Sequence, residues 1–156
     1  MKPIAIGSDH AGFILKEYVK KILSERDILF TDYGTFSEES CDYPDFAALV
    51  SQAVTSGDSE KGILCCGSSS GMVIVANKFK GVRAVACHNL FAAEMSRKHN
   101  DSNILALGER ILELKEAKEV VQAWLDTEFE GGRHKRRLDK LRENIHFNSE
   151  IKSAKF

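Results

Sequence analysis

Short apolar runs alternate with amphipathic stretches along this chain. Five runs are nearly all apolar, as is typical of strands buried on both faces of a parallel sheet. They occupy residues 3–7, 28–33, 62–65, 82–87 and 103–107. Between them, apolar residues recur every three or four positions, which places them on one face of a helix. The pattern predicts an α/β protein that alternates strands with helices.

The amphipathic stretches give three clear helical stripes. Their apolar members are Leu15, Tyr18, Val19, Ile22 and Leu23; Phe46, Leu49, Val50, Ala53 and Val54; and Leu114, Ala117, Val120, Val121, Trp124 and Leu125. A further helix is expected to begin at Leu90 and to end near His99. Strands and helices in this order predict an αβα three-layer sandwich with right-handed crossovers.

The character of the chain changes after residue 128. Phe129-Glu130-Gly131-Gly132 interrupts the pattern, and a last helix follows with the apolar residues Leu138, Leu141 and Ile145. This C-terminal helix is too short to form a domain, so its apolar stripe is expected to cover either the chain's own sheet or a second subunit. The polar end, residues 148–156, is expected to be a flexible tail or to rest on a neighbour.

Length and composition exclude several classes of protein. A chain of 156 residues predicts one domain over 1–156, and 43% hydrophobic with 29% charged residues is ordinary for a soluble protein. The net charge of −1 gives no indication of nucleic acid or a membrane surface, and no apolar run is long enough for a membrane span. A strand follows Met1 directly, so no signal peptide is expected. Four cysteines without zinc-type or disulfide spacing predict a cytoplasmic protein with reduced thiols and no metal.

The segment Leu64-Cys65-Cys66-Gly67-Ser68-Ser69-Ser70-Gly71 carries the strongest chemical signal. A buried strand enters a turn of glycine and serine, and an apolar helix follows. Backbone N–H groups at such a helix start attract anions, and their field is expected to lower the pKa of the neighbouring thiol. A base beside an oxyanion trap suits proton abstraction next to a carbonyl. The alternative is an ordinary turn with a buried cysteine.

Polar residues also follow other strands, at the edge of the sheet where such folds bind ligands. Ser8, Asp9 and His10 come after the first strand, and three successive polar groups exceed what a helix cap requires. Tyr43 stands at an ordinary helix entry, with a weaker indication of function. Arg110 follows the fifth strand and is a candidate anion ligand.

Two further sets of polar residues allow more than one interpretation. His88 and Asn89 are typical of a helix cap, and His99 suits the dipole at the end of its helix without any function. Arg133 and Arg137 share one helix face and present forks suited to phosphate. Because the chain is not basic and no aromatic residues accompany them, a single small phosphate fits better than nucleic acid.

Taken together, the chain resembles the type B ribose-5-phosphate isomerases and their allose- and galactose-6-phosphate isomerase relatives. The resemblance runs from about residue 2 to residue 141. It rests on Gly7-Ser8-Asp9-His10-Ala11-Gly12-Phe13, Asp42-Tyr43-Pro44, Cys66-Gly67-Ser68 through Gly71, Ala76-Asn77-Lys78, Arg97-Lys98-His99-Asn100-Asp101 and Glu130-Gly131-Gly132-Arg133-His134. It implies a Rossmann-like sandwich with a five-stranded parallel sheet, no cofactor, and a homodimer whose active sites borrow residues from the partner. Such dimers often pair into tetramers.

The resemblance also implies roles for individual residues. Cys66 matches the catalytic base, and Ser68 matches the hydroxyl residue beside the reacting carbons. His99, helped by Asp9, matches the group that opens the sugar ring. Asn100 matches a ligand of the enediolate, and the backbone N–H groups of Gly67 to Gly71, which include Ser69 and Ser70, are expected to hold the enediolate oxygens with it. His10, Arg133 and Arg137 match phosphate contacts, Arg110 is expected to join them, and Tyr43 lines the sugar pocket.

One position departs from the family's pattern. Ser69 stands where the loop usually has a glycine. If the position requires a positive φ, the serine costs about 1 kcal/mol of strain or more. The side chain could also narrow the space beside the enediolate.

The expected reaction is the metal-free interconversion of D-ribose 5-phosphate and D-ribulose 5-phosphate. The first alternative is isomerisation of allose 6-phosphate or galactose 6-phosphate; galactose-type enzymes use unlike subunits, whereas this chain keeps the full residue set. A catalytically silent sugar-phosphate sensor would need neither Cys66 nor His99. A nucleotide-binding module would require an acidic ribose ligand after the second strand, for which Asp42 is a poor candidate.

Overall fold

The computed structural model describes residues 2–142. Ile145 of the predicted last helix and the polar end at 148–156 lie outside the described residues. The strands are β1 (Ile4–Ser8), β2 (Phe30–Asp32), β3 (Gly62–Cys66), β4 (Ala84–Ala86) and β5 (Ile104–Gly108). The helices are a short 3-10 turn η1 (His10–Gly12), α1 (Phe13–Glu25), α2 (Tyr43–Ser56), α3 (Ser70–Ala76), α4 (Leu90–Asn100), α5 (Leu114–Asp126) and α6 (Arg133–Arg142).

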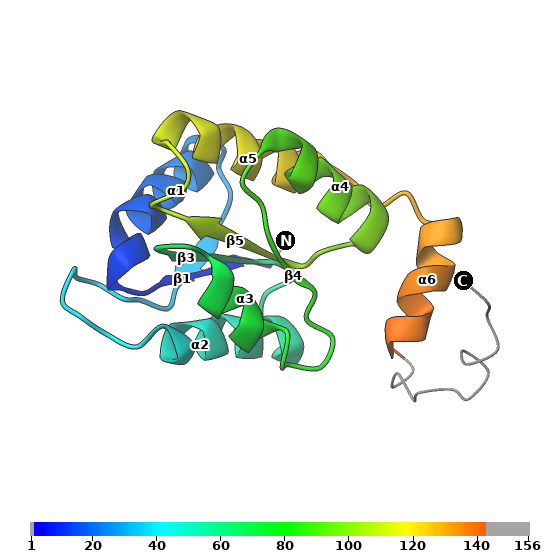
Figure 1. Ribbon diagram of the computed structural model, residues 1–156, viewed down its shortest axis with the longest axis horizontal. Coiled ribbons are helices and arrows are strands. Elements are labelled where there is room, and N and C mark those ends of the chain that lie inside the picture. The colour runs from blue at the N-terminus through cyan, green and yellow to red at the C-terminus, as the bar shows by residue number, and fades with distance from the viewer. Residues whose placement is uncertain (1, 143–156) are drawn as a thin grey trace, which may run out of the picture.

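The five strands form one parallel sheet in the order β2-β1-β3-β5-β4. Helices α2 and α3 cover one face, and α1, α4 and α5 cover the other (Figure 1). The predicted three-layer α/β sandwich is therefore confirmed. The predicted strands at 28–33 and 82–87 are too long, because β2 and β4 are edge strands that pair on one side only and span three residues each.

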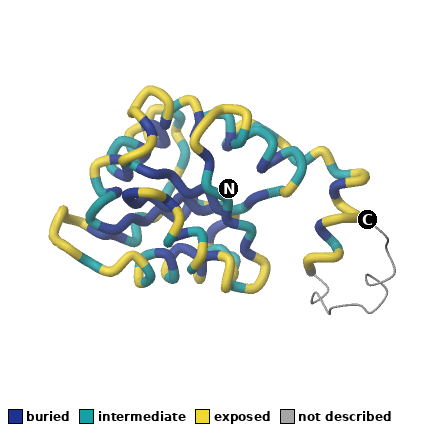
Figure 2. Tube along the Cα trace, viewed as in Figure 1, coloured by how far each residue is buried: buried dark blue, intermediate teal, exposed yellow. Residues whose placement is uncertain are grey.

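Two apolar cores lie on opposite faces of the sheet. Side chains alternate along a strand, so Cys65 of β3 enters the core beneath α1 and α5, which contains Trp124. Cys66, the next residue, enters the core beneath α2 and α3 with Met72. Figure 2 shows the buried residues running through the central strands. The two neighbouring cysteines therefore occupy different environments.

A fully buried lysine ties α1 to the segment between β2 and α2. The Lys16 ammonium donates to the two carboxylate oxygens of Asp32 at 2.7 and 2.8 Å and to the Thr35 carbonyl at 2.6 Å. Burial acts to raise the pKa of Asp32, but hydrogen bonds from Lys16 and Lys20 hold that pKa below its ordinary value. The ion pair fixes the start of the segment that leads to Tyr43.

The predicted C-terminal helix is present as α6. It lies beyond the end of α4, away from both faces of the sheet, and contacts α4 (Figure 1). Leu138 is buried, whereas Leu141 is exposed. The helix therefore does not cover the chain's own sheet within the described residues. Among residues 2–142, no helix is long and apolar enough to cross a membrane.

Substitution Asp32→Asn is expected to remove the carboxylate that pairs closely with the buried Lys16 ammonium and to leave it the longer contact with the partly exposed Glu17 carboxylate at 3.5 Å, which costs about 3 kcal/mol of unfolding free energy at pH 7. Because the pKa of Asp32 is lower in the folded protein, its carboxylate stabilises the fold above the unfolded pKa of about 3.9. That contribution is lost as the pH falls through the folded pKa. The difference from wild type should therefore close in acid, as measured by urea unfolding at a series of pH values.

The control is Asp126→Asn, which removes an exposed ion pair with Arg26 and should change the unfolding free energy by less than about 1 kcal/mol. A difference between wild type and Asp32→Asn that is absent at pH 7, or that persists undiminished at pH 2, would contradict this account.

Candidate active site

The carboxyl ends of β1, β3 and β5 meet at one edge of the sheet. The register pairs Ser8 with Cys65, and Cys66 with Gly108. Backbone hydrogen bonds continue the contact beyond the strands: the Glu109 N–H donates to the Cys66 carbonyl at 2.8 Å, and the Arg110 N–H donates to the Gly67 carbonyl at 3.0 Å. The loops that carry Asp9, Cys66 and Arg110 are thus brought together.

The Cys66 sulfur is nearly buried and accepts a hydrogen bond from the Ser69 backbone N–H at 3.0 Å. The predicted lowering of its pKa is wrong for this chain. Burial raises the pKa of the thiol, and the charge of Asp9 adds to the rise. Backbone N–H groups of Ser68, Ser69 and Met72 oppose the rise without cancelling it. Helix α3 spans seven residues, and its neutral donors do not replace the lost hydration of a thiolate.

The loop after Cys66 has an unusual conformation at Ser69. Its φ of +67° is in the left-handed half of the Ramachandran plot, which a serine adopts at a cost of about 1 kcal/mol or more. The position therefore has the positive φ at which a serine in place of the usual glycine is strained. Ser68 and Ser70 are exposed, and Gly67 and Ser69 are buried.

Two glycines permit close packing around this loop. A Cβ on Gly12 would lie 2.3 Å from the Cys65 carbonyl carbon, so η1 packs directly on the end of β3. A Cβ on Gly71 would lie 2.7 Å from the Tyr43 ring. Tyr43 therefore lies against the start of α3, at the mouth of the loop.

Polar side chains that follow β1 and β5 lie near the same carboxyl ends of the strands. The Asp9 carboxylate accepts the Gly12 N–H at 3.0 Å, and burial raises its pKa despite the opposing charge of His10. His10 Nδ1 lies 3.2 Å from the backbone N and O of Cys41. The Arg110 guanidinium lies against Gly67, whose Cβ would be 3.4 Å away. Six of the predicted positions, Asp9, His10, Tyr43, Cys66, Gly67 and Arg110, thus form one group with Ser68–Gly71, which we call the thiol half-site.

The remaining predicted residues form a second group at α4 and α6. His99 is half-buried and stacks on His134, with ring centroids 4.2 Å apart and an interplanar angle of 9°. Asn100 and Arg137 line a pocket of about 360 Å³ with these rings. Arg133 Nε donates to His134 Nε2 at 3.3 Å. We call His99, Asn100, Arg133 and Arg137 the histidine half-site.

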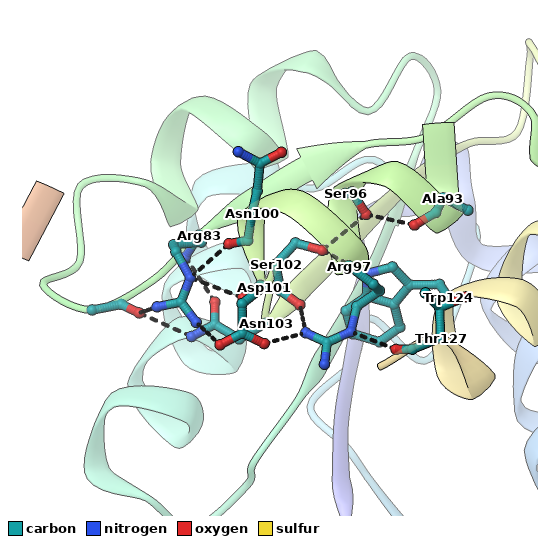
Figure 3. Close-up of polar contacts among 11 residues, drawn as sticks. Arg83, Ala93, Ser96, Arg97, Asn100, Asp101, Ser102, Asn103, Trp124 and Thr127 are labelled. Atoms are coloured by element: carbon teal, nitrogen blue, oxygen red, sulfur yellow. Dashed lines mark hydrogen bonds and ion pairs between the residues drawn. The ribbon is translucent and has the colours of Figure 1, made fainter. Parts of the chain in front are cut away.

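A polar network holds the end of α4 in place (Figure 3). Asp101 has a φ of +45° and accepts from Arg97 at 2.8 Å and from Arg83 at 3.0 Å. Arg97 also donates to the Ser102 carbonyl at 2.6 Å, and Trp124 Nε1 donates to the Ser102 hydroxyl at 2.8 Å. These contacts fix the end of α4, which carries His99 and Asn100.

The two half-sites lie at opposite ends of the strands, the thiol half-site at their carboxyl ends and the histidine half-site at their amino ends. Helix α4 runs antiparallel to the strands, so Asn100 lies near the amino end of β5, which begins at Ile104. Cys66 pairs with Gly108 at the other end of that strand. The length of β5 alone separates these ends by about 13 Å. In Figure 1 the start of α3 and the end of α4 lie at opposite ends of the sheet. One chain does not bring His99 to Cys66.

A further cluster was not predicted from the sequence. Ligand atoms of His99, Glu130 and His134 lie within 4.8 Å of one another. The two rings are nearly parallel, whereas a cation bound by both nitrogens must lie close to the plane of each ring. Burial and the positive charges of His99 and Arg133 lower the pKa of His134. With Arg137 in the same pocket, the arrangement favours an anion over a metal ion.

His88 is the residue whose contact sequence reasoning missed. Asn89 caps α4 as predicted, because its side chain accepts the Ala92 N–H at 2.8 Å. His88, however, lies with Nε2 2.9 Å from the Ser69 hydroxyl. The sequence pattern that could have indicated this contact is the position of His88 directly after a strand, at the carboxyl ends where ligand sites form.

Comparison with known proteins agrees with these observations. A family model described as Ribose/Galactose Isomerase matches residues 4–141. Ribose-5-phosphate isomerase B of Escherichia coli is 48% identical over 90% of this chain and 95% of its own length. D-erythrulose-4-phosphate isomerase of Pectobacterium atrosepticum is 41% identical over 90% and 93%. The structure of Clostridium thermocellum ribose-5-phosphate isomerase B superimposes with a TM-score of 0.89 at 50% identity, covering 92% of this chain and 96% of that one. The chain belongs to the ribose/galactose isomerase family.

Proposed function

We propose that this protein interconverts D-ribose 5-phosphate and D-ribulose 5-phosphate through a cis-enediolate. The observation that carries the proposal is the Cys66 sulfur at the carboxyl ends of the strands, where it accepts the Ser69 backbone N–H at 3.0 Å and the N–H groups of Ser68 and Met72 also favour its thiolate. The 48% identity to a protein named ribose-5-phosphate isomerase B supports the choice of sugar. Residues 4–141, which match the family, are proposed to form one isomerase domain.

The reaction begins with opening of the furanose ring. His99 gives a proton to the ring oxygen, and Asp9 accepts the proton of the anomeric hydroxyl. The raised pKa of Asp9 suits this second task, because a carboxylate of higher pKa is a stronger base. The product of this step is the open-chain aldehyde.

Proton transfer between carbons follows at Cys66. The thiolate removes the proton from C2, the C1–C2 double bond forms, and negative charge develops on O1. Backbone N–H groups of Gly67 to Gly71 and the Asn100 side chain stabilise that charge. The Ser68 hydroxyl relays the O2 proton to O1, and Cys66 returns its proton to C1, which gives the ketose. Cys66 returns the proton that it takes up, and exchange with solvent removes the proton from Asp9 and restores the one that His99 gave. The sugar gains and loses no electrons, so the cycle requires no redox partner.

The phosphate is held by arginine side chains from both half-sites and by His10. His10 and Arg110 stand at the thiol half-site, and Arg133 and Arg137 at the histidine half-site. An arginine fork matches two phosphate oxygens and remains charged at every relevant pH. Binding energy from this remote group places C2 against the sulfur.

The complete site requires two copies of the chain. Because Cys66 and His99 lie at opposite edges, we propose a homodimer in which each thiol half-site meets the partner's histidine half-site, giving two shared sites. Apolar surface is available: a groove of about 840 Å³ lined by Phe79, Val82, Leu138 and Leu141 separates α6 from the β4 edge. Ile74 and Phe91 are more than 60% exposed. Pairing of dimers into tetramers would be a further level of assembly.

Other sugar phosphates remain the second candidates. Allose 6-phosphate and galactose 6-phosphate require the same chemistry, and a relative at 41% identity is named for erythrulose 4-phosphate. The presence of both half-sites in one chain favours a self-sufficient homodimer over unlike subunits. It also argues against a silent sugar-phosphate sensor. The four free cysteine thiols support a place in the cytoplasm.

The reaction class is tested by incubating the protein with ribose 5-phosphate in D₂O containing EDTA and following the sugar by proton NMR. Ribulose 5-phosphate should form with deuterium entering at the C1/C2 positions, because the transferred proton exchanges with solvent on the sulfur. Folded protein that gives neither product nor exchange would contradict the ribose assignment. The four-carbon and six-carbon phosphates then serve as substrates in the same assay. Activity that EDTA abolishes would contradict the metal-free mechanism.

The choice of base is tested by the matched pair Cys66→Ala and Cys65→Ala. Loss of the Cys66 thiol should lower kcat by about 10²–10⁴ and leave the protein folded, with an unfolding free energy lower by about 1 kcal/mol or less. Cys65 is fully buried on the other face of the sheet, so its truncation should lower the unfolding free energy by about 1 kcal/mol and preserve kcat. An inactive Cys65 variant beside an active Cys66 variant would show that the wrong thiol was assigned.

A further inference from the structure

Ser69 combines a left-handed backbone with a buried side chain. Its φ is +67°, and its side chain is completely covered, whereas those of Ser68 and Ser70 are exposed. A non-glycine residue in such a conformation persists only where its surroundings hold it. The contacts of the Ser69 hydroxyl therefore identify what fixes the loop.

The hydroxyl lies between a histidine and a carbonyl group. It donates its single proton to the Ser68 carbonyl oxygen, so it can only accept from the second partner. That partner is Nε2 of His88, at 2.9 Å, which donates in the tautomer that has its proton on Nε2. His88 follows β4, whereas Ser69 follows β3, and β5 separates these two strands in the sheet. The contact thus connects the loop after β3 to the end of β4, the second strand along the sheet from β3.

The Ser68 carbonyl, which accepts the Ser69 hydroxyl proton, belongs to the same peptide unit as the N–H that donates to the Cys66 sulfur. The Ser68–Ser69 peptide presents its C=O to the Ser69 hydroxyl and its N–H to the Cys66 sulfur at 3.0 Å. A trans peptide is planar, with C=O and N–H pointing in opposite directions. Fixing the carbonyl end therefore fixes the direction of the N–H end.

We propose that His88 is a positioning residue for Cys66, acting through the Ser69 hydroxyl to keep the Ser68–Ser69 N–H on the sulfur. Its effect on turnover rests on the proposed function, because Cys66 acts there as the base. Its effect on the sulfur itself does not. A hydrogen bond to the sulfur favours the thiolate, so losing its alignment disfavours that form.

The test compares His88→Ala with His88→Gln. His88 is exposed, so neither change is expected to unfold the protein. In His88→Ala, the pH midpoint for alkylation of Cys66 by iodoacetamide, followed by mass spectrometry of its peptide, should move upward. The kcat should fall about three- to tenfold with KM unchanged, the size expected for one hydrogen bond. His88→Gln, whose amide N–H can donate to Ser69, should bring both the pH midpoint and kcat most of the way back to the wild-type values. Asp9 and Cys65, the titratable groups beside the sulfur, are the same in all variants.

A second background separates positioning from a merely structural effect. Ser69→Gly removes the hydroxyl, so His88→Ala should have no further effect on the midpoint or on kcat in that background. An unchanged midpoint in His88→Ala would overturn the proposal, as would equal losses in the serine and glycine backgrounds. A shifted midpoint in protein that does not isomerise ribose 5-phosphate would support the positioning role and count against the proposed function alone.

Discussion

A parallel sheet has one carboxyl edge, and each connecting helix returns the chain to the other edge. This constraint governs the whole site. Cys66 ends β3, whereas His99 lies in the last turn of α4, so the proposed base and the proposed ring-opening group lie at opposite ends of the strands within one chain. Arg83, Asp101 and Trp124 hold the end of α4 there, and α6 extends away from the sheet beyond it. The fold thus separates the two half-sites within one chain, which is why the proposed site requires a second copy.

The sulfur shows how burial and backbone dipoles compete. Backbone N–H groups favour the thiolate, but desolvation and the Asp9 carboxylate raise the pKa of Cys66 overall. A thiol of higher pKa is ionised in fewer molecules at neutral pH, but each thiolate is a stronger base toward a proton on carbon. The alignment of each remaining donor therefore matters, which gives the strained Ser69 and its contact with His88 their importance.

Much of the fold could be predicted because burial on both faces leaves a simple pattern. The central strands were located to within one residue, since apolar runs there have no exposed face. Edge strands were overestimated: Leu29, within the predicted 28–33 strand, is 69% exposed. Lys16 was overlooked because a lysine on a helix normally faces water, whereas here Asp32 and the Thr35 carbonyl take its charge. The gathering of Asp9, Cys66 and Arg110 followed from the strand-end rule. The His88 contact depends on strand order, and the His99–His134 stack on the placement of α6, neither of which periodicity encodes.

Mixing two inactive variants tests the shared site most directly. Cys66→Ala and His99→Asn homodimers should each be inactive, because every site lacks one essential group. After subunit exchange, checked by native mass spectrometry, half of the dimers are mixed, and each has one site with both groups intact. The account predicts recovery of about a quarter of the wild-type rate. Exchanged dimers that stay inactive would show that Cys66 and His99 of different copies do not share a site.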